Sequence, residues 1–173
     1  TISPSGKIEE TPSQIKLELC AHQKRTLYEM LQRERHKYRL IGEHNSLFLC
    51  DNVGSGKSIE ILSLIAKEPI VNSMWENSYY INPGMSSYQK QKYAIDGYRL
   101  SKSVEMFNSN LLIVPHNIYF QWVEYIEKNT TLKFYAIDRQ KKIIDDSEKM
   151  KTILNNNNII IVKSTMFRAF HDI

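Results

Sequence analysis

The segment Asp51-Asn52-Val53-Gly54-Ser55-Gly56-Lys57-Ser58 combines residue types that can hold a phosphate group. It follows the apolar run 46–50 and precedes a longer apolar stretch that begins at Ile59, so the sequence predicts a strand, a glycine-containing loop and a helix in that order. Unpaired backbone N–H groups and the positive end of the helix dipole converge at such a junction. Asp51 stands where the strict pattern G-x-x-x-x-G-K-[ST] has a glycine, but the flanking elements still favour an anion site.

The positions within this segment have separate chemical roles in a phosphate loop. Gly54 and Gly56, with Ser55 between them, let the backbone turn around the phosphate groups. Lys57 can reach the β and γ phosphates, and the hydroxyl of Ser58 can bind Mg²⁺. The alternative is an ordinary glycine turn with an exposed lysine, which requires neither a buried strand before it nor an apolar helix after it. Lys57 and Ser58 are therefore the candidate catalytic residues, and ATP and Mg²⁺ are the candidate cofactors.

Hydrolysis also needs an acidic residue at the end of a neighbouring strand, where it positions Mg²⁺ and water. Asp138 follows the expected strand 132–137, but Arg139 and Gln140 come next, and a helix N-cap is the simpler interpretation of Asp138. The pair 145–146 is better explained as part of a helix surface. We therefore expect that the Mg²⁺-binding acid of such a site is absent from this chain.

Patterns typical of helices and strands alternate along the chain. We expect helices at 15–39, 57–67, 117–129 and 139–154, and strands at 46–50, 111–114, 132–137 and 159–162. Short apolar runs of this kind are typical of parallel strands that are buried on both faces. The predicted fold class is therefore α/β, with a parallel sheet that helices cover on both faces.

Two segments lie outside this alternation. Residues 1–14 have the composition of a linker, with Pro4 and Pro12 among several small polar residues. Residues 69–109 have no clear period, and we expect them to form an insertion in a lobe that spans 15–173. The insertion holds half of the chain's 10 tyrosines, interleaved with lysine and arginine. A single-strand binding surface, a packed appendage, a docking surface for a partner and a loop all remain open for it.

Composition limits the class of protein. The chain has 173 residues, is 42% hydrophobic and carries a net charge of +4, which suits one compact domain and is compatible with a polyanionic partner. Cys20 and Cys50 are spaced as two reduced thiols and not as metal ligands. No apolar stretch reaches the length of about 18 residues that spans a bilayer, and a signal-peptide pattern is missing. We expect an intracellular protein of the cytoplasm or nucleus, or of a virion, without a membrane partner.

Four elements together resemble the superfamily-two helicase and translocase ATPases, especially the chromatin-remodeller-like and large-DNA-virus branches. The segment Cys50 to Glu60 is similar to the family's D-E-x-G-x-G-K-T loop, in which an aspartate at the position of Asp51 is usual. Upstream, Leu19-Cys20-Ala21-His22-Gln23 resembles the family's L-x-x-[HY]-Q element. Downstream, Leu112 to Trp122 resembles a strand followed by P-x-x-L-x-x-Q-W. The segment Ile160 to Phe167 resembles the strand with a Ser/Thr turn before the D-E-A-H box.

The resemblance implies the N-terminal part of a RecA-like phosphate-loop lobe, incomplete in this chain because the D-E-A-H box comes later. It further implies a motor that couples ATP hydrolysis to movement on DNA or RNA, with a second RecA-like lobe in the full-length protein. This piece alone is then expected to be inactive. Two alternatives are a non-hydrolysing module in which nucleotide gates assembly, and a small-substrate phosphotransferase, although the latter does not call for the P-x-x-I-x-x-Q-W helix.

The resemblance also assigns roles outside the phosphate loop. Gln23 is expected to read the adenine edge, the alternative being a solvated side chain on a helix. Trp122 is expected to pack in the core. The candidates for nucleic-acid contact, whose alternatives are helix capping and an ordinary strand-end turn, are Pro115, His116, Asn117, Gln121, Ser164 and Thr165.

Overall fold

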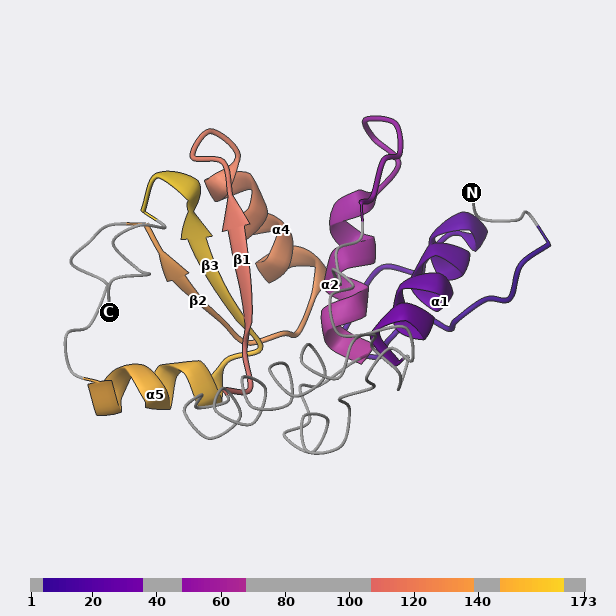
Figure 1. The fold of residues 1–173 in the computed structure, drawn as a ribbon. Coiled ribbons are helices and arrows are strands. Elements are labelled where there is room, and N and C mark those ends of the chain that lie inside the picture. Colours follow the sequence, from indigo (N-terminus) through magenta and orange to yellow (C-terminus); the bar gives the residue numbers. More distant parts are fainter. Residues whose placement is uncertain (1–4, 36–47, 68–106, 139–146, 167–173) are drawn as a thin grey trace, which may run out of the picture.

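The computed structural model describes residues 5–35, 48–67, 107–138 and 147–166 (Figure 1). Within these ranges, no helix is long and apolar enough to cross a bilayer. The insertion predicted at 69–109 lies almost entirely outside the described residues. The elements, in chain order, are α1 (Ala21–Arg35), α2 (Lys57–Lys67), β1 (Asn110–Val114), α4 (Tyr119–Asn129), β2 (Phe134–Ile137), α5 (Ser147–Asn156), β3 (Ile159–Lys163) and the short 3₁₀ helix η3 (Ser164–Met166).

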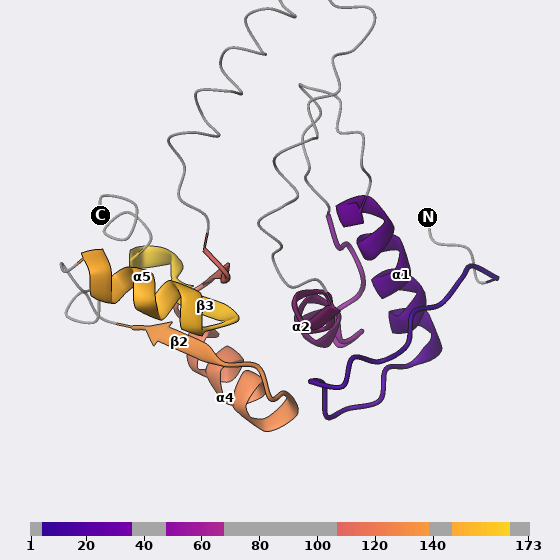
Figure 2. The same cartoon turned by 90° about the horizontal axis from the view of Figure 1, so that it is seen from below.

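The described strands form one parallel sheet of three strands in the order β1-β3-β2. The last strand in sequence is therefore the central one, and Ile159 to Val162 are all buried. Ile159 and Ile161 pack in the cluster that contains Ile126 of α4, whereas Ile160 and Val162 pack with Met150 of α5. Figure 2 shows α4 and α5 on opposite faces of the sheet. The predicted α/β class, with helices on both faces of a parallel sheet, is confirmed.

Helix α2 lies between α1 and the sheet in both views (Figures 1 and 2). Its bounds are those expected from the sequence, because apolar residues at helical spacing follow the glycine loop directly. Ile59 and Leu62 of α2 are buried in the same cluster as Leu27 and Leu31 of α1. The partly buried Trp122 packs against this cluster, as predicted. This core fixes the start of α2, and with it the phosphate loop, relative to α1.

Two expected elements differ from the structure. The helix expected from residue 15 begins only at Ala21, because Ile15 forms an isolated antiparallel bridge with Thr130. The strand expected at 46–50 is not formed by the described residues 48–50, and the Phe48 side chain is 85% exposed. A strand requires a hydrogen-bonded neighbour, and none of the described strands pairs with this segment. An apolar run in the sequence does not show whether such a neighbour is present.

The remaining bounds shift by a few residues or extend into residues that are not described. Helix α4 begins two residues later than expected, because the Ile118 N–H donates to the Pro115 carbonyl oxygen in a turn at 3.2 Å. Strand β2 is shorter than the expected 132–137. The first part of the helix expected at 139–154 lies outside the described residues, as do residues 36–39 of the first helix.

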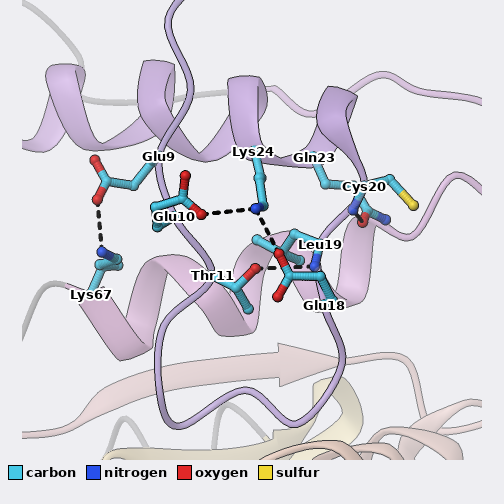
Figure 3. Close-up of polar contacts among 9 residues, drawn as sticks. All are labelled: Glu9, Glu10, Thr11, Glu18, Leu19, Cys20, Gln23, Lys24 and Lys67. Atoms are coloured by element: carbon cyan, nitrogen blue, oxygen red, sulfur yellow. Dashed lines mark hydrogen bonds and ion pairs between the residues drawn. The ribbon is translucent and has the colours of Figure 1, made fainter.

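Residues 5–20 run along α1 and α2 without forming a helix or strand of their own (Figure 3). The Glu9 carboxylate pairs with Lys67 of α2 at 2.7 Å, and Lys24 of α1 pairs with Glu10 at 2.9 Å. At the other end of the segment, the Lys16 N–H donates to the Asn129 carbonyl oxygen at 2.8 Å. The segment thereby connects α1, α2 and the end of α4.

The Glu9–Lys67 pair is expected to contribute measurably to stability because only 23% and 26% of its side chains are exposed. The Glu9→Gln variant should lose about 1 kcal/mol of unfolding free energy, at the upper end of the range for ion pairs near the surface. Urea unfolding measures the loss. Glu10→Gln is the matched control, because Glu10 is 74% exposed and should matter less. Equal losses in the two variants would contradict a specific role for the Glu9 contact.

Candidate functional site

The predicted phosphate loop, residues 51–58, lies at the end of the molecule toward which the strands point (Figure 1). We call this segment the phosphate loop. Gly54 and Gly56 have φ of 88° and 91°, a region that side chains with a Cβ rarely adopt. Lys57 is the first residue of α2, and its ammonium donates to the carbonyl oxygens of Asp51 at 2.8 Å and Asn52 at 2.7 Å. The lysine thus closes the loop on itself, with backbone carbonyls as acceptors that an anionic phosphate can replace.

Gly56 is the tightest point of this loop. A Cβ atom at Gly56 would overlap the side-chain amide nitrogen of Gln23 and would lie 3.6 Å from Cγ2 of Ile59. A Cβ atom at Gly54 would meet no atom within 4 Å. Glycine at 56 therefore serves both the backbone conformation and the close approach of α1.

Gln23 connects the start of α1 to the phosphate loop. Its Nε2 donates to the Ser55 carbonyl oxygen at 3.1 Å, and its Oε1 accepts from the Cys20 N–H at 2.9 Å. The second bond is one half of a capping box, in which the third helical residue reaches back to the N-cap. The side chain is 8% exposed, so the alternative of a solvated glutamine is excluded. Both ends of the amide are engaged with the backbone, so contact with adenine requires these bonds to be exchanged.

Glu60, in the first turn of α2, was not singled out from the sequence. The residue is fully buried, and neither carboxyl oxygen accepts a hydrogen bond among the described residues. Burial raises its pKa above 4.5 and the nearby Asp51 adds to this, whereas the Thr26 hydroxyl, His22 and Lys57 act in the opposite direction. The Thr26 hydroxyl also donates to the His22 carbonyl oxygen at 3.1 Å, so it is not held for Glu60 alone. Burial is the largest of these effects, so the net direction of the pKa shift is upward.

This environment predicts a pH-dependent stability. The folded-state pKa of Glu60 is raised above 4.5, so the folded state holds the proton more tightly than the unfolded state, and stability falls as pH rises above that value. The Glu60→Gln variant lacks this titration and should melt at a higher temperature than wild type at pH 8. The two should differ little at pH 4. Glu124→Gln, at an exposed position of α4, is the control and should show no such trend. A stability gain that is independent of pH would contradict a buried carboxyl that titrates.

The sequence-predicted candidates for nucleic-acid contact lie on the loops that follow two neighbouring strands. Val114 at the end of β1 is in register with Lys163 at the end of β3, so the segments that begin at Pro115 and Ser164 leave the sheet side by side. The side chains there are exposed: Pro115, His116, Asn117, Gln121, Ser164 and Thr165. The N-cap position of α4, Ile118, has no side-chain cap. The structure thus brings all six to one edge of the lobe, and their contact with nucleic acid stays a prediction.

A cluster of aromatic and charged residues at the same edge was missed in the sequence. The ammonium of Lys163 lies 5.0 Å from the ring centroid of Tyr119 and 4.9 Å from that of Phe120, and the two rings meet edge to face at 5.3 Å. Tyr119 is buried, and burial followed by the charge of Asp138 raises its pKa to about 12. We call Tyr119, Phe120 and Lys163 the strand-end aromatic cluster. Only the strand order, which pattern analysis does not supply, brings them together.

A comparison with known families shows which family the chain belongs to. The SNF2-related domain matches residues 22–168, which is most of the chain. The chain belongs to the SNF2-related domain family. No curated protein matches it significantly. SNF2-related domains are ATPase domains of the helicase and translocase type, and the family acts on nucleic acid, so the resemblance to superfamily-two ATPases of the remodeller-like branch is confirmed.

The small parallel sheet fits an incomplete RecA-like lobe of this SNF2-related domain. Among the residues that the structure describes, no group of three or more His, Cys, Asp and Glu residues could hold a metal ion. Asp138 directly follows β2 and acts on Tyr119, and the residues that it would cap as a helix start lie outside the described ranges. The binding of Mg²⁺ by Ser58 stays a prediction.

Proposed function

We propose that this chain is the ATP-binding part of a nucleic-acid motor that couples ATP hydrolysis to movement on DNA or RNA. The observation that carries the proposal is the position of two surfaces on one lobe. The phosphate loop and the exposed polar loops after β1 and β3 lie at the same end of the molecule (Figure 1). Closure of a second lobe over this end would act on both surfaces at once, and membership of the SNF2-related family supports that arrangement.

The loop residues fit a nucleotide. Gly54 and Gly56 supply the left-handed backbone that the curl requires, and α2 begins directly after the loop, where a helix N-terminus favours an anion. The proposal assigns Lys57 to the β and γ phosphates and Ser58 to Mg²⁺, which would neutralise charge on the phosphate oxygens. Gln23 would exchange its bond with Ser55 for the adenine edge. ATP and Mg²⁺ are thus the proposed cofactors.

A directional motor and a nucleotide-gated assembly module make different predictions. The test measures whether the full-length protein displaces the third strand of a triplex or one strand of a duplex. Displacement with ATP is compared with displacement with a non-hydrolysable analogue. Displacement that needs hydrolysis supports the motor. Nucleotide binding that changes assembly without any displacement or turnover would contradict the motor and support the non-hydrolysing module.

A further inference from the structure

The strand-end aromatic cluster has the composition of a site for an unpaired nucleotide. Phe120 is 64% exposed although it is a large apolar side chain at the start of a helix. Its ring is held in place by the edge-to-face contact with Tyr119, whose own exposure is 1%. An exposed ring on a rigid support loses little conformational freedom when a ligand packs against it.

Lys163 places a positive charge over one face of this ring. Its ammonium lies 4.9 Å from the Phe120 centroid, and Lys163 is the last residue of the central strand β3, so a well-packed element fixes its backbone. The neighbouring exposed side chains of Asn117, Gln121 and Ser164 are polar, which favours a hydrated, anionic ligand over an apolar partner. Because the ammonium covers one face of a ring that is 64% exposed, a base would stack on the other face, and the cation could contact a phosphate of the same strand.

We propose that Phe120 stacks on an unpaired base of a single strand while Lys163 contacts a neighbouring phosphate. In a duplex each base face is covered by the next base pair, so Phe120 can stack only where the strand is single. This inference rests on the proposed function and adds the form of nucleic acid that the lobe holds. Single-stranded DNA and single-stranded RNA share this chemistry.

The buried hydroxyl of Tyr119 supports a function for the cluster. This oxygen has no hydrogen-bond partner among the described residues, and burial of an unpaired hydroxyl is unfavourable. A phenylalanine would keep the apolar packing without that penalty, so stability alone does not explain the tyrosine. Tyr119 contacts Phe120 in an edge-to-face arrangement and lies beneath the ammonium of Lys163, so it can orient both.

The test measures binding of the full-length protein to oligo(dT), oligo(rU) and a duplex of equal length at one salt concentration. The Phe120→Ala variant should lose about tenfold in affinity for single strands, because one base–aromatic stack is lost. Its duplex affinity should stay within about twofold, since no stack forms there. Phe120→Trp should retain single-strand binding, whereas Phe120→Leu, which is apolar but not flat, should not. The oligo(dT) and oligo(rU) arms identify the sugar.

Two further arms separate stacking from charge. Lys163→Gln should weaken binding to single strands and duplex alike and lower the slope of log affinity against log salt by about 1. Lys128→Gln, at an exposed position in the last turn of α4, should change neither. An abasic site is then moved along the oligonucleotide. At one position it should lower the affinity of the wild-type protein as much as Phe120→Ala does. At that position it should not lower the affinity of the Phe120→Ala variant further.

The outcomes distinguish this inference from the proposed function. Stacking at Phe120 would be overturned if Phe120→Ala lost equal affinity for single strands and for duplex. It would also be overturned if the losses from Phe120→Ala and from the abasic site were fully additive. In either case, nucleic-acid-stimulated ATP turnover could still support the motor. Failure of the wild-type protein to bind any nucleic acid would overturn both.

Discussion

The Lys57→Ala variant of the full-length protein is expected to lose ATP turnover by about 100- to 1,000-fold, as when a positioned donor is removed from a developing oxyanion. Lys57 is the only basic side chain between residues 48 and 58, and it begins the helix whose N-terminus faces the loop. Its ammonium now donates to two loop carbonyls, at 2.8 Å and 2.7 Å, so it is already held within reach of the bound phosphates. Steady-state phosphate release measures the loss.

Lys128→Ala is the control for this change, because Lys128 is an exposed lysine at the far end of α4. It should turn over ATP like wild type. Lys57→Arg keeps the charge but enlarges the group, and it should recover only part of the activity because the loop holds a compact ammonium. Wild-type turnover in Lys57→Ala would rule out the phosphate loop as the catalytic site.

The Gly56→Ala variant is expected to damage the site more than Gly54→Ala. Both residues have positive φ, so an added Cβ strains each by about 1–2 kcal/mol. Only at Gly56 must the Gln23 side chain also move, which breaks its bonds to the Ser55 carbonyl oxygen and the Cys20 N–H. Each lost bond is worth about 1 kcal/mol. Urea unfolding and titration with a fluorescent ATP analogue measure both effects.

A double variant tests the cause of the Gly56→Ala effect. Gln23→Ala removes the side chain that the new Cβ would displace. The stability losses of Gly56→Ala and Gln23→Ala should therefore be less than additive when the two changes are combined. Additive losses would show that backbone strain alone, and not the contact between α1 and the loop, explains the effect.

The sequence predicts best those parts of the structure that depend on local spacing. Helix α2 has the predicted bounds because the glycine loop and the apolar period adjoin each other, and the apolar run 159–162 predicts the buried strand β3. The apolar run that ends at Cys50 looks the same by composition, yet Phe48 is exposed. The pairing of a strand depends on distant partners, which local pattern does not contain.

The site contacts that could not be predicted from the sequence are contacts between residues far apart in the chain. Gln23 and Ser55 lie 32 residues apart, and their bond depends on how α1 packs against α2. The approach of Lys163 to Phe120 follows from the order β1-β3-β2, because it places the end of β3 beside the start of α4. An acidic residue within an apolar helical stretch, as at Glu60, is a signal in the sequence that could have marked this missed residue.

The proposed nucleic-acid motor is tested most directly by phosphate release from Mg²⁺-ATP. The full-length protein and its Lys57→Ala variant are compared, each with and without DNA or RNA. A motor driven from this phosphate loop should show turnover that rises on addition of nucleic acid and disappears in the variant. Turnover that nucleic acid leaves unchanged, or that survives in Lys57→Ala, would contradict a nucleic-acid motor driven from this phosphate loop.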